Sequence, residues 1–189
     1  TGWTARKDRP DRPRPPGRPS CPDPAIRRTT AGTVADRPVA LLFSGGLDSC
    51  AAAILLATDH RPVHLLTFDH GHGHLFLGAS RKTAGDLERA FPGAMVHRVI
   101  SCKALFRRLV TGDLAANYRR YRSRFIWCFG CKLAMHAETI AYCLRHGIDL
   151  ASDGSSLETR YYVEQSDVGL SLIEGLYADF GVRFTKPVH

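Results

Sequence analysis

The sequence predicts an α/β domain built on about five mostly parallel strands, and three observations support this. Short apolar runs alternate along the chain with longer segments of helix-forming residues, which is the pattern of strands joined by helices. The runs are apolar throughout, as is typical of strands buried on both faces of a sheet. Hydrophobic residues make up 44% of the 189 positions, which is enough for one domain with its own core.

Strands and helices are predicted in alternation from residue 38 onward. The predicted strands are residues 38–44, 62–70, 94–101, 148–152 and 182–187. The predicted helices are residues 49–60, 80–91, 102–110, 131–146 and 167–181. In the fourth helix, Leu133, Ala137, Ile140 and Leu144 fall on one side at helical spacing, so we expect them to form its buried face.

The first 36 residues differ in composition from the rest. They begin "TGWTARKDRPDRPRPPGRPSCPDP", which is rich in Pro and Arg and nearly free of large apolar side chains. Such a segment cannot bury enough surface to offset its ordering entropy, so we predict a disordered tail over 1–36 and one domain over 37–189. Residues 1–37 hold nine Lys or Arg and four Asp, a large part of the net charge of +8. The arm is able to contact nucleic acid, although a passive tail is the simpler interpretation.

Composition also argues against a membrane protein and a secreted one. No apolar run approaches the ~18 residues of a transmembrane helix. The sequence shows no apolar signal-peptide core. The six cysteines lack the dense spacing of a secreted disulfide scaffold. We therefore expect a cytoplasmic protein with reduced thiols.

The stretch "FSGGLDSC", residues 43–50, lies between the first predicted strand and helix. Gly45 and Gly46 let the backbone approach a ligand closely, and N–H groups at a helix N-terminus attract anions. Ser44 and Ser49 add hydroxyl donors, and Asp48 is suited to hold a Mg²⁺ ion that phosphate oxygens also bind. The G-x-x-x-x-G-K-[ST] pattern of Walker loops is absent. The sequence therefore predicts a phosphate site at the carboxyl edge of the sheet.

Residues 44–49 match the S-G-G-x-D-S signature, and here the chain resembles the PP-loop ATP pyrophosphatases. "ALLFSGGLDS" followed by "VHLLTFDHG" most resembles the 7-cyano-7-deazaguanine synthases over about residues 38–101, although the zinc cysteines of those enzymes near the C-terminus are absent. The resemblance implies a Rossmann-like fold of the adenine nucleotide alpha hydrolase type, with helices on both faces of the sheet. It also implies cleavage of ATP between the α and β phosphates, with magnesium. Relatives continue past "FTKPVH", so we expect a chain truncated at its C-terminus.

The resemblance also implies which residues contact ATP. Phe68 and Asp69, at the end of the second strand, would line the adenine site, and Asp153 lies in the polar loop after the fourth strand. The full set of expected ATP-binding residues is Ser44, Gly45, Gly46, Leu47, Asp48, Ser49, Phe68, Asp69 and Asp153.

A second motif is the C-x-x-C formed by Cys128 and Cys131, which we predict to open the helix at 131–146. A helix N-terminus lowers the pKa of a thiol, so we expect both cysteines to tend toward thiolate. Cys102 ends the third strand at the same edge of the sheet, so the three cysteines are predicted to meet near the nucleotide. Cys143 lies about 18 Å from Cys131 along one helix, too far to share a ligand set, and we expect it to be a buried helix cysteine.

The three-cysteine arrangement is similar to the iron–sulfur site of tRNA thiolases in the same superfamily, although their third ligand comes later in the chain. The alternatives are an iron–sulfur cluster, a zinc site completed by a histidine such as His136, a persulfide relay, and two inert thiols. Magnesium at Asp48 is the other expected metal.

Together these features predict an enzyme that adenylates a carbonyl or amide oxygen, releases pyrophosphate, and then transfers sulfur to a nucleobase or tRNA. The C-x-x-C favours sulfur over the alternative, nitrogen transfer as in the 7-cyano-7-deazaguanine synthases. A non-catalytic nucleotide-binding module is the third hypothesis. The expected catalytic residues are Asp48, Cys102, Cys128 and Cys131. The expected partners are ATP, the acceptor, a sulfur donor protein and a second copy in a homodimer, with no membrane.

Two further stretches permit more than one interpretation. In "YRRYRSRFIW", residues 118–127, arginines alternate with aromatic residues, a pattern able to hold phosphates and stacked bases but also typical of a solvated helix face. In "DHGHGH", His70, His72 and His74 stand at alternate positions, which indicates either a metal site or a strand end near the adenine.

Overall fold

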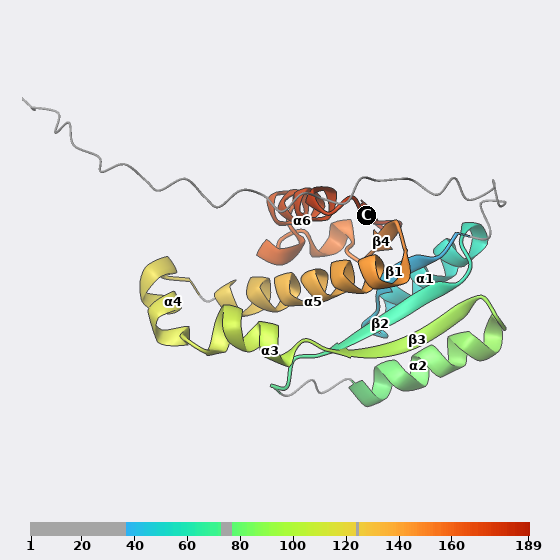
Figure 1. Ribbon diagram of the computed structural model, residues 1–189, viewed down its shortest axis with the longest axis horizontal. Helices are drawn as coiled ribbons and strands as arrows, with labels where there is room; N and C mark the ends of the chain where they lie inside the picture. The colour runs from blue at the N-terminus through green and yellow to red at the C-terminus, as the bar shows by residue number, and fades with distance from the viewer. Residues whose placement is uncertain (1–36, 73–76, 124) are drawn as a thin grey trace, which may run out of the picture. The chain divides into compact units, whose positions relative to one another are not determined.

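The computed structural model of the protein describes residues 37–72, 77–123 and 125–189 (Figure 1). The predicted tail, His74 and Arg124 lie outside these residues. Within the described parts of the chain, no helix is both long enough and apolar enough to cross a membrane.

Five parallel strands form one sheet in the order β3-β2-β1-β4-β5. The strands are β1 Val39–Leu42, β2 Val63–Asp69, β3 Met95–Ser101, β4 Leu150–Ser152 and β5 Arg183–Thr185. β1 lies in the middle, because the chain builds outward to β3 on one side and later returns to add β4 and β5 on the other. The order reverses between β1 and β4, and ligands of open α/β sheets bind at such a switch point.

The helices cover both faces of this sheet, which confirms the predicted fold class. The longer helices are α1 Leu47–Asp59, α2 Leu77–Ala90, α4 Leu114–Tyr121, α5 Phe125–His146 and α6 Asp167–Asp179. The short ones are α3 Lys103–Phe106, the π-helical turn η2 Arg107–Thr111, and the 3₁₀ turns η3 Leu157–Thr159 and η4 Val163–Gln165. Figure 1 shows α2 and α5 on opposite sides of β2 and β3.

The core is divided into two layers by the sheet. Val39 and Leu41 of β1 pack with α1 and α2 in one layer. Ala40 and Leu42 pack with α3, α5 and α6 in the other. Successive side chains of a strand point to opposite faces, so a strand covered on both sides must be apolar at every position. This explains why β1 is a continuous apolar run rather than an alternating one.

Helix α5 differs from its prediction in where it begins. It starts at Phe125 rather than Cys131. Gly130 therefore lies inside the helix, at a point where η2 packs closely against it. A Cβ atom built on Gly130 would lie only 2.3 Å from Cγ2 of Val110.

The buried face of α5 matches its prediction only in part. Ile140 is buried and Leu133 packs against the core, but Leu144 is 55% exposed. The buried side instead includes Lys132, His136, Thr139 and Cys143, which recur at helical spacing. Because the first two of these are polar, α5 carries polar groups into the interior at the carboxyl edge of the sheet.

Candidate functional site

A cavity of about 500 Å³ opens at the switch point between the ends of β1 and β4. The loop after β1 lines one side of it, from Ser44 to Ser49 with the exception of Gly45, and residues 153–155 after β4 line another. The first turns of α5 and residues of the connection between β4 and α6 complete the wall. The cavity thus lies where the topology places ligands in this kind of sheet.

The loop after β1 is held in shape by its own serines and by α2. Gly45 has a φ of +78°, and a Cβ atom there would lie 2.7 Å from Cα of Ser80, so only glycine fits. Ser80 donates a hydrogen bond to the carbonyl of Ser44 at 2.5 Å. Ser49 Oγ donates to the carbonyl of Gly46 at 2.9 Å. Gly46 caps α1 without a side-chain hydrogen bond, so the first N–H groups of the helix remain available for an anion.

The loop after β4 touches the start of α1 directly. Gly154 lies so close that a Cβ atom there would be 2.8 Å from the backbone nitrogen of Ser49. Ser156 Oγ also donates a hydrogen bond to Oδ2 of Asp48 at 3.3 Å. These contacts hold the two loops together as one wall of the cavity.

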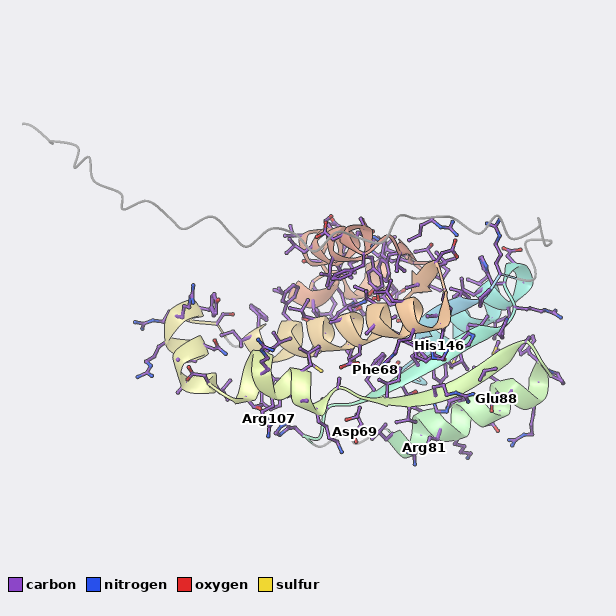
Figure 2. All side chains as sticks on the ribbon, in the orientation of Figure 1. Phe68, Asp69, Arg81, Glu88, Arg107 and His146 are labelled. Atoms are coloured by element: carbon purple, nitrogen blue, oxygen red, sulfur yellow. The ribbon has the colours of Figure 1, made fainter. Side chains whose placement is uncertain are left out.

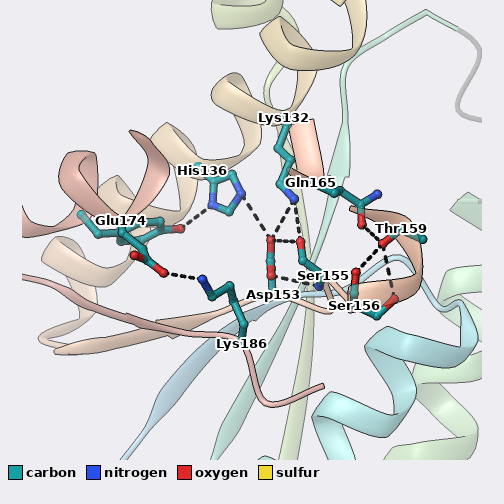
Figure 3. Close-up of polar contacts among 10 residues, drawn as sticks. Lys132, His136, Asp153, Ser155, Ser156, Thr159, Gln165, Glu174 and Lys186 are labelled. Atoms are coloured by element: carbon teal, nitrogen blue, oxygen red, sulfur yellow. Dashed lines mark hydrogen bonds and ion pairs between the residues drawn. The ribbon is translucent and has the colours of Figure 1, made fainter. Parts of the chain in front are cut away.

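A buried ion pair between α5 and the loop after β4 forms another part of the cavity wall (Figure 3). Nζ of Lys132 lies 3.0 Å from Oδ2 of Asp153 and donates to Oγ of Ser155 at 2.8 Å. Ser155 in turn donates to both carboxylate oxygens, from Oγ at 2.8 Å and from its backbone nitrogen at 3.0 Å. The Lys132 side chain is 10% exposed and the Asp153 side chain 5%. An ammonium has three N–H donors, so Lys132 keeps one for a ligand.

Lys132 was missed by the reasoning from sequence, although it is the one Lys or Arg among the described residues that line the cavity. The available signal was its spacing. Lys132 follows Cys128 by four residues and precedes His136 by four, so all three lie along one side of a helix.

His136 lies behind this ion pair and is completely buried. Its Nδ1 is hydrogen-bonded to the hydroxyl of Tyr177 at 2.9 Å, and its Nε2 lies 3.7 Å from Oδ2 of Asp153. Burial lowers the pKa of His136 to about 3, so the ring is neutral at physiological pH. Nε2 has no hydrogen-bond partner among the described residues.

Asp153 remains ionised beside this neutral ring. Burial alone would raise the pKa of its carboxyl, but the charge of Lys132, together with His136 and the Ser155 N–H, holds that pKa below its ordinary value. The pair is therefore a carboxylate and an ammonium, and Lys132 presents a positively charged group to the cavity.

Cys128 and Cys131 line the same cavity as the loop after β1. The expectation of lowered thiol pKa values is wrong, because α5 begins at Phe125 and Cys131 lies beyond its first turn. Burial, followed by the nearby carboxylate of Glu164, raises the pKa of Cys128. Burial, followed by Cys128 and Glu164, raises the pKa of Cys131 to about 11. Both residues are therefore thiols at neutral pH.

Cys102 does not line the cavity. It follows β3 at the expected edge, but it is 1% exposed and belongs to the hydrophobic core with Phe106. Burial, with the neighbouring Cys131, raises its pKa to about 12. Among the described residues, no group of three or more His, Cys, Asp or Glu side chains is arranged to hold a metal ion. The three cysteines thus do not fit an iron–sulfur cluster or zinc as placed. Cys143 is fully buried in the core, as expected.

Phe68 and Asp69, expected at the adenine, do not line the cavity either; Figure 2 labels both. Phe68 is 3% exposed and packs in the core. Asp69 Oδ2 lies 2.8 Å from Nζ of Lys103, and Oδ1 accepts a hydrogen bond from the Gly71 N–H. Phe68 and Asp69 end β2, and β1 lies between β2 and β4 in the sheet. These two residues are therefore not next to the loop after β4.

Comparisons with known proteins find a partial family match and a shared fold. Residues 25–99, which include the loop after β1, match the family model of asparagine synthase, a family of PP-loop ATP pyrophosphatases. No curated protein matches the chain. Among solved structures, the chain is similar to a predicted subunit of tRNA methyltransferase from Methanocaldococcus jannaschii, with a TM-score of 0.52 and 20% identity over 80% of this chain and 68% of that one. At that identity, the likeness shows a shared fold.

Proposed function

We propose that the protein is an ATP pyrophosphatase that adenylates a carbonyl or amide oxygen and then transfers sulfur to the activated carbon. One observation carries the proposal: a single cavity is lined by the loop after β1, by Lys132 and by both cysteines of the C-x-x-C. The asparagine synthase match over residues 25–99 supports the ATP-dependent half of the reaction.

In this proposal, the β and γ phosphates of ATP lie at the start of α1. The free N–H groups and the helix dipole favour anions there, and Ser44 and Ser49 contribute hydroxyl groups. Lys132 donates its remaining N–H to a phosphate oxygen from its part of the cavity wall. Asp48 offers a carboxylate in the same cavity. That fits Mg²⁺, which binds through one or two carboxylates together with phosphate oxygens and would neutralise charge on the leaving pyrophosphate.

The reaction would proceed in two displacements. The acceptor oxygen attacks the α phosphorus, the bond from that phosphorus to the bridging oxygen breaks, and pyrophosphate leaves. A persulfide sulfur on Cys128, supplied by a sulfur donor protein, then attacks the acceptor carbon, and AMP leaves with the original oxygen. Finally the Cys131 thiol gives up its proton and attacks the Cys128 sulfur, which forms a disulfide and frees the thiolated product. An external thiol reduces the disulfide.

A second candidate is nitrogen transfer, in which ammonia attacks the same adenylate. The raised pKa values of Cys128 and Cys131 favour it, because a protonated thiol is a weak nucleophile. The two candidates are distinguished by whether sulfide or ammonia accelerates AMP formation once an acceptor is present. A nucleotide-binding module without catalysis would release no pyrophosphate at all.

The test of the ATP-dependent half is the substitution Asp48→Asn. We expect it to reduce magnesium-dependent pyrophosphate release by about a hundredfold or more, since it removes the carboxylate beside the phosphates. The thermal midpoint should stay within a few degrees of wild type. Asp59→Asn, at the other end of α1, is the matched control and should release pyrophosphate normally. Normal release by the Asp48 variant would refute the proposal.

A further inference from the structure

The segment between β3 and α5 concentrates positive charge. Residues 103–124 hold seven Lys or Arg and one Asp, whereas residues 38–102 and 125–189 together hold ten Lys or Arg and thirteen Asp or Glu. The folded part of the chain outside this segment is therefore acidic on balance. A charge distribution this uneven indicates a surface built for a polyanion.

The arginines of this segment are exposed and not engaged with carboxylates. Arg107, Arg108, Arg119, Arg120 and Arg122 all lie on the surface. Within the described residues, none of them forms an ion pair with an acidic side chain. Their charge is thus available to an external partner.

Aromatic side chains lie between these arginines. Tyr118 is 54% exposed, Tyr121 58% and Phe125 52%, and the guanidinium of Arg120 lies over the ring of Tyr121 at 5.4 Å. Helix α4 itself buries no residue, so its aromatic residues do not serve the core. Figure 1 shows α4 away from the sheet, beyond the start of α5. We call Arg119, Arg120 and Arg122 together with Tyr118 and Tyr121 the α4 surface.

An apolar hollow lies beside α4. The hollow has a volume of about 560 Å³ and is lined by Leu114, Ala115, Tyr118, Ser123, Ile126 and Trp127. Trp127 lines the hollow and the cavity alike. Its ring also meets Phe106 edge-on, with 5.1 Å between centroids. Trp127 therefore lies where the hollow and the cavity border each other.

We propose that the α4 surface binds a single-stranded polynucleotide, with the arginines on its phosphates and the tyrosines and Trp127 stacked on its bases. Unpaired bases stack on aromatic rings irrespective of sequence, and arginines follow the phosphate backbone. The excess of unpaired cations favours this occupant over a protein, whose interface core is depleted of charge. If one base of the bound strand is also the acceptor that ATP activates, that part of the inference rests on the proposed function.

The experiment measures fluorescence anisotropy of a labelled twelve-nucleotide strand with the full chain. Matched RNA, DNA and duplex forms are compared. We expect the single strands to bind more tightly than the duplex, with an affinity that falls as salt rises. Arg119→Gln, Arg120→Gln and Arg122→Gln together should weaken binding about tenfold or more. The same variant should reduce the slope of log affinity against log salt by about 2, at roughly 0.7 per lost phosphate contact.

Two controls separate the α4 surface from positive charge in general. Arg81→Gln, Lys82→Gln and Arg89→Gln remove three charges from α2 and should change affinity less than threefold. Tyr118→Ala with Tyr121→Ala should weaken single-strand binding, while Tyr161→Ala with Tyr162→Ala, another exposed pair, should not. The residues 1–36 are the same in every variant, so their contribution cancels.

Equal weakening by the α4 and α2 variants would overturn the inference, and so would preference for the duplex or the absence of binding to either single strand. Stronger binding of RNA or of DNA identifies the type of strand and supports the inference in either case. Binding of Mg·ATP, measured by calorimetric titration on the same samples without a strand, tests the ATP site of the proposed function separately. ATP binding without strand binding refutes only this inference, and strand binding without ATP binding refutes only the proposed function.

Discussion

Lys132 both forms the buried ion pair with Asp153 and lines the cavity. Lys132→Met should abolish detectable ATP binding and destabilise the protein by about 3–5 kcal/mol, because it leaves Asp153 buried without its partner. Lys132→Met combined with Asp153→Asn should recover much of the stability but none of the binding. Urea unfolding and calorimetric titration with Mg·ATP measure the two effects. Binding by the double variant would show that Lys132 does not contact the nucleotide.

His136 makes the stability of the protein depend on pH. Its pKa is about 3 in the folded state, while an unfolded histidine titrates near 6.5, so below pH 6.5 the unfolded state binds one more proton. The contribution is complete above pH 6.5 and is lost as the pH falls toward 3. Wild type should therefore lose about 1.2 kcal/mol more than His136→Asn between pH 6 and 5.

Urea unfolding of both proteins at pH 7, 6 and 5 measures that difference. Asp153 does not contribute to the difference between these pH values. The stabilisation from its lowered pKa is lost only below the ordinary pKa of an aspartate, which lies below pH 5. His64 and His97, whose pKa values are also lowered by burial, are present in both proteins. Parallel pH profiles would mean that His136 is not buried in neutral form.

At the scale of elements, the contact between the loop after β4 and α1 depends on Gly154. Gly154→Ala would place a Cβ atom 2.8 Å from the Ser49 nitrogen, so the loop must move away from α1. We expect weaker ATP binding, by about tenfold, and a loss of 1–3 kcal/mol in stability. Gly175→Ala is the control: it lies in α6 with no atom within 4 Å of the new Cβ, and should stabilise the protein by about 0.5–1 kcal/mol. Unchanged affinity in the Gly154 variant would show that the two loops act independently.

The start of α5 places the C-x-x-C against the nucleotide loop, and its role is testable by substitution. Cys128→Ser with Cys131→Ser should abolish thiolated product while leaving Mg·ATP affinity within threefold, since the phosphates are expected at α1. Cys50→Ser, in α1, controls for the loss of a thiol elsewhere. Product mass spectrometry and titration with ATP provide the readouts. A double variant that still forms product at the wild-type rate would leave nitrogen transfer as the leading reaction.

For the molecule as a whole, the sequence predicts the local features well and the long-range ones poorly. The five strands, their mostly parallel arrangement and the loop at residues 44–49 follow from runs of neighbouring residues. Lys132 and Asp153 become partners only through the placement of α5 beside β4, which no local pattern contains. Helix α5 begins at Phe125, before its predicted start, and includes Gly130, which packs closely against Val110, a residue outside the helix.

The central position of β1 affects how the chain folds during synthesis. One edge of β1 is covered early by β2, but Ala40 must wait for Ala151 before its other edge is paired. Until then the nascent chain exposes an apolar strand edge, which invites pairing with other chains. A fragment restricted to residues 25–99 would carry the signature loop in this unfinished state, without Lys132 or Asp153. Expression trials should therefore retain β4, because shorter pieces are the ones prone to aggregate.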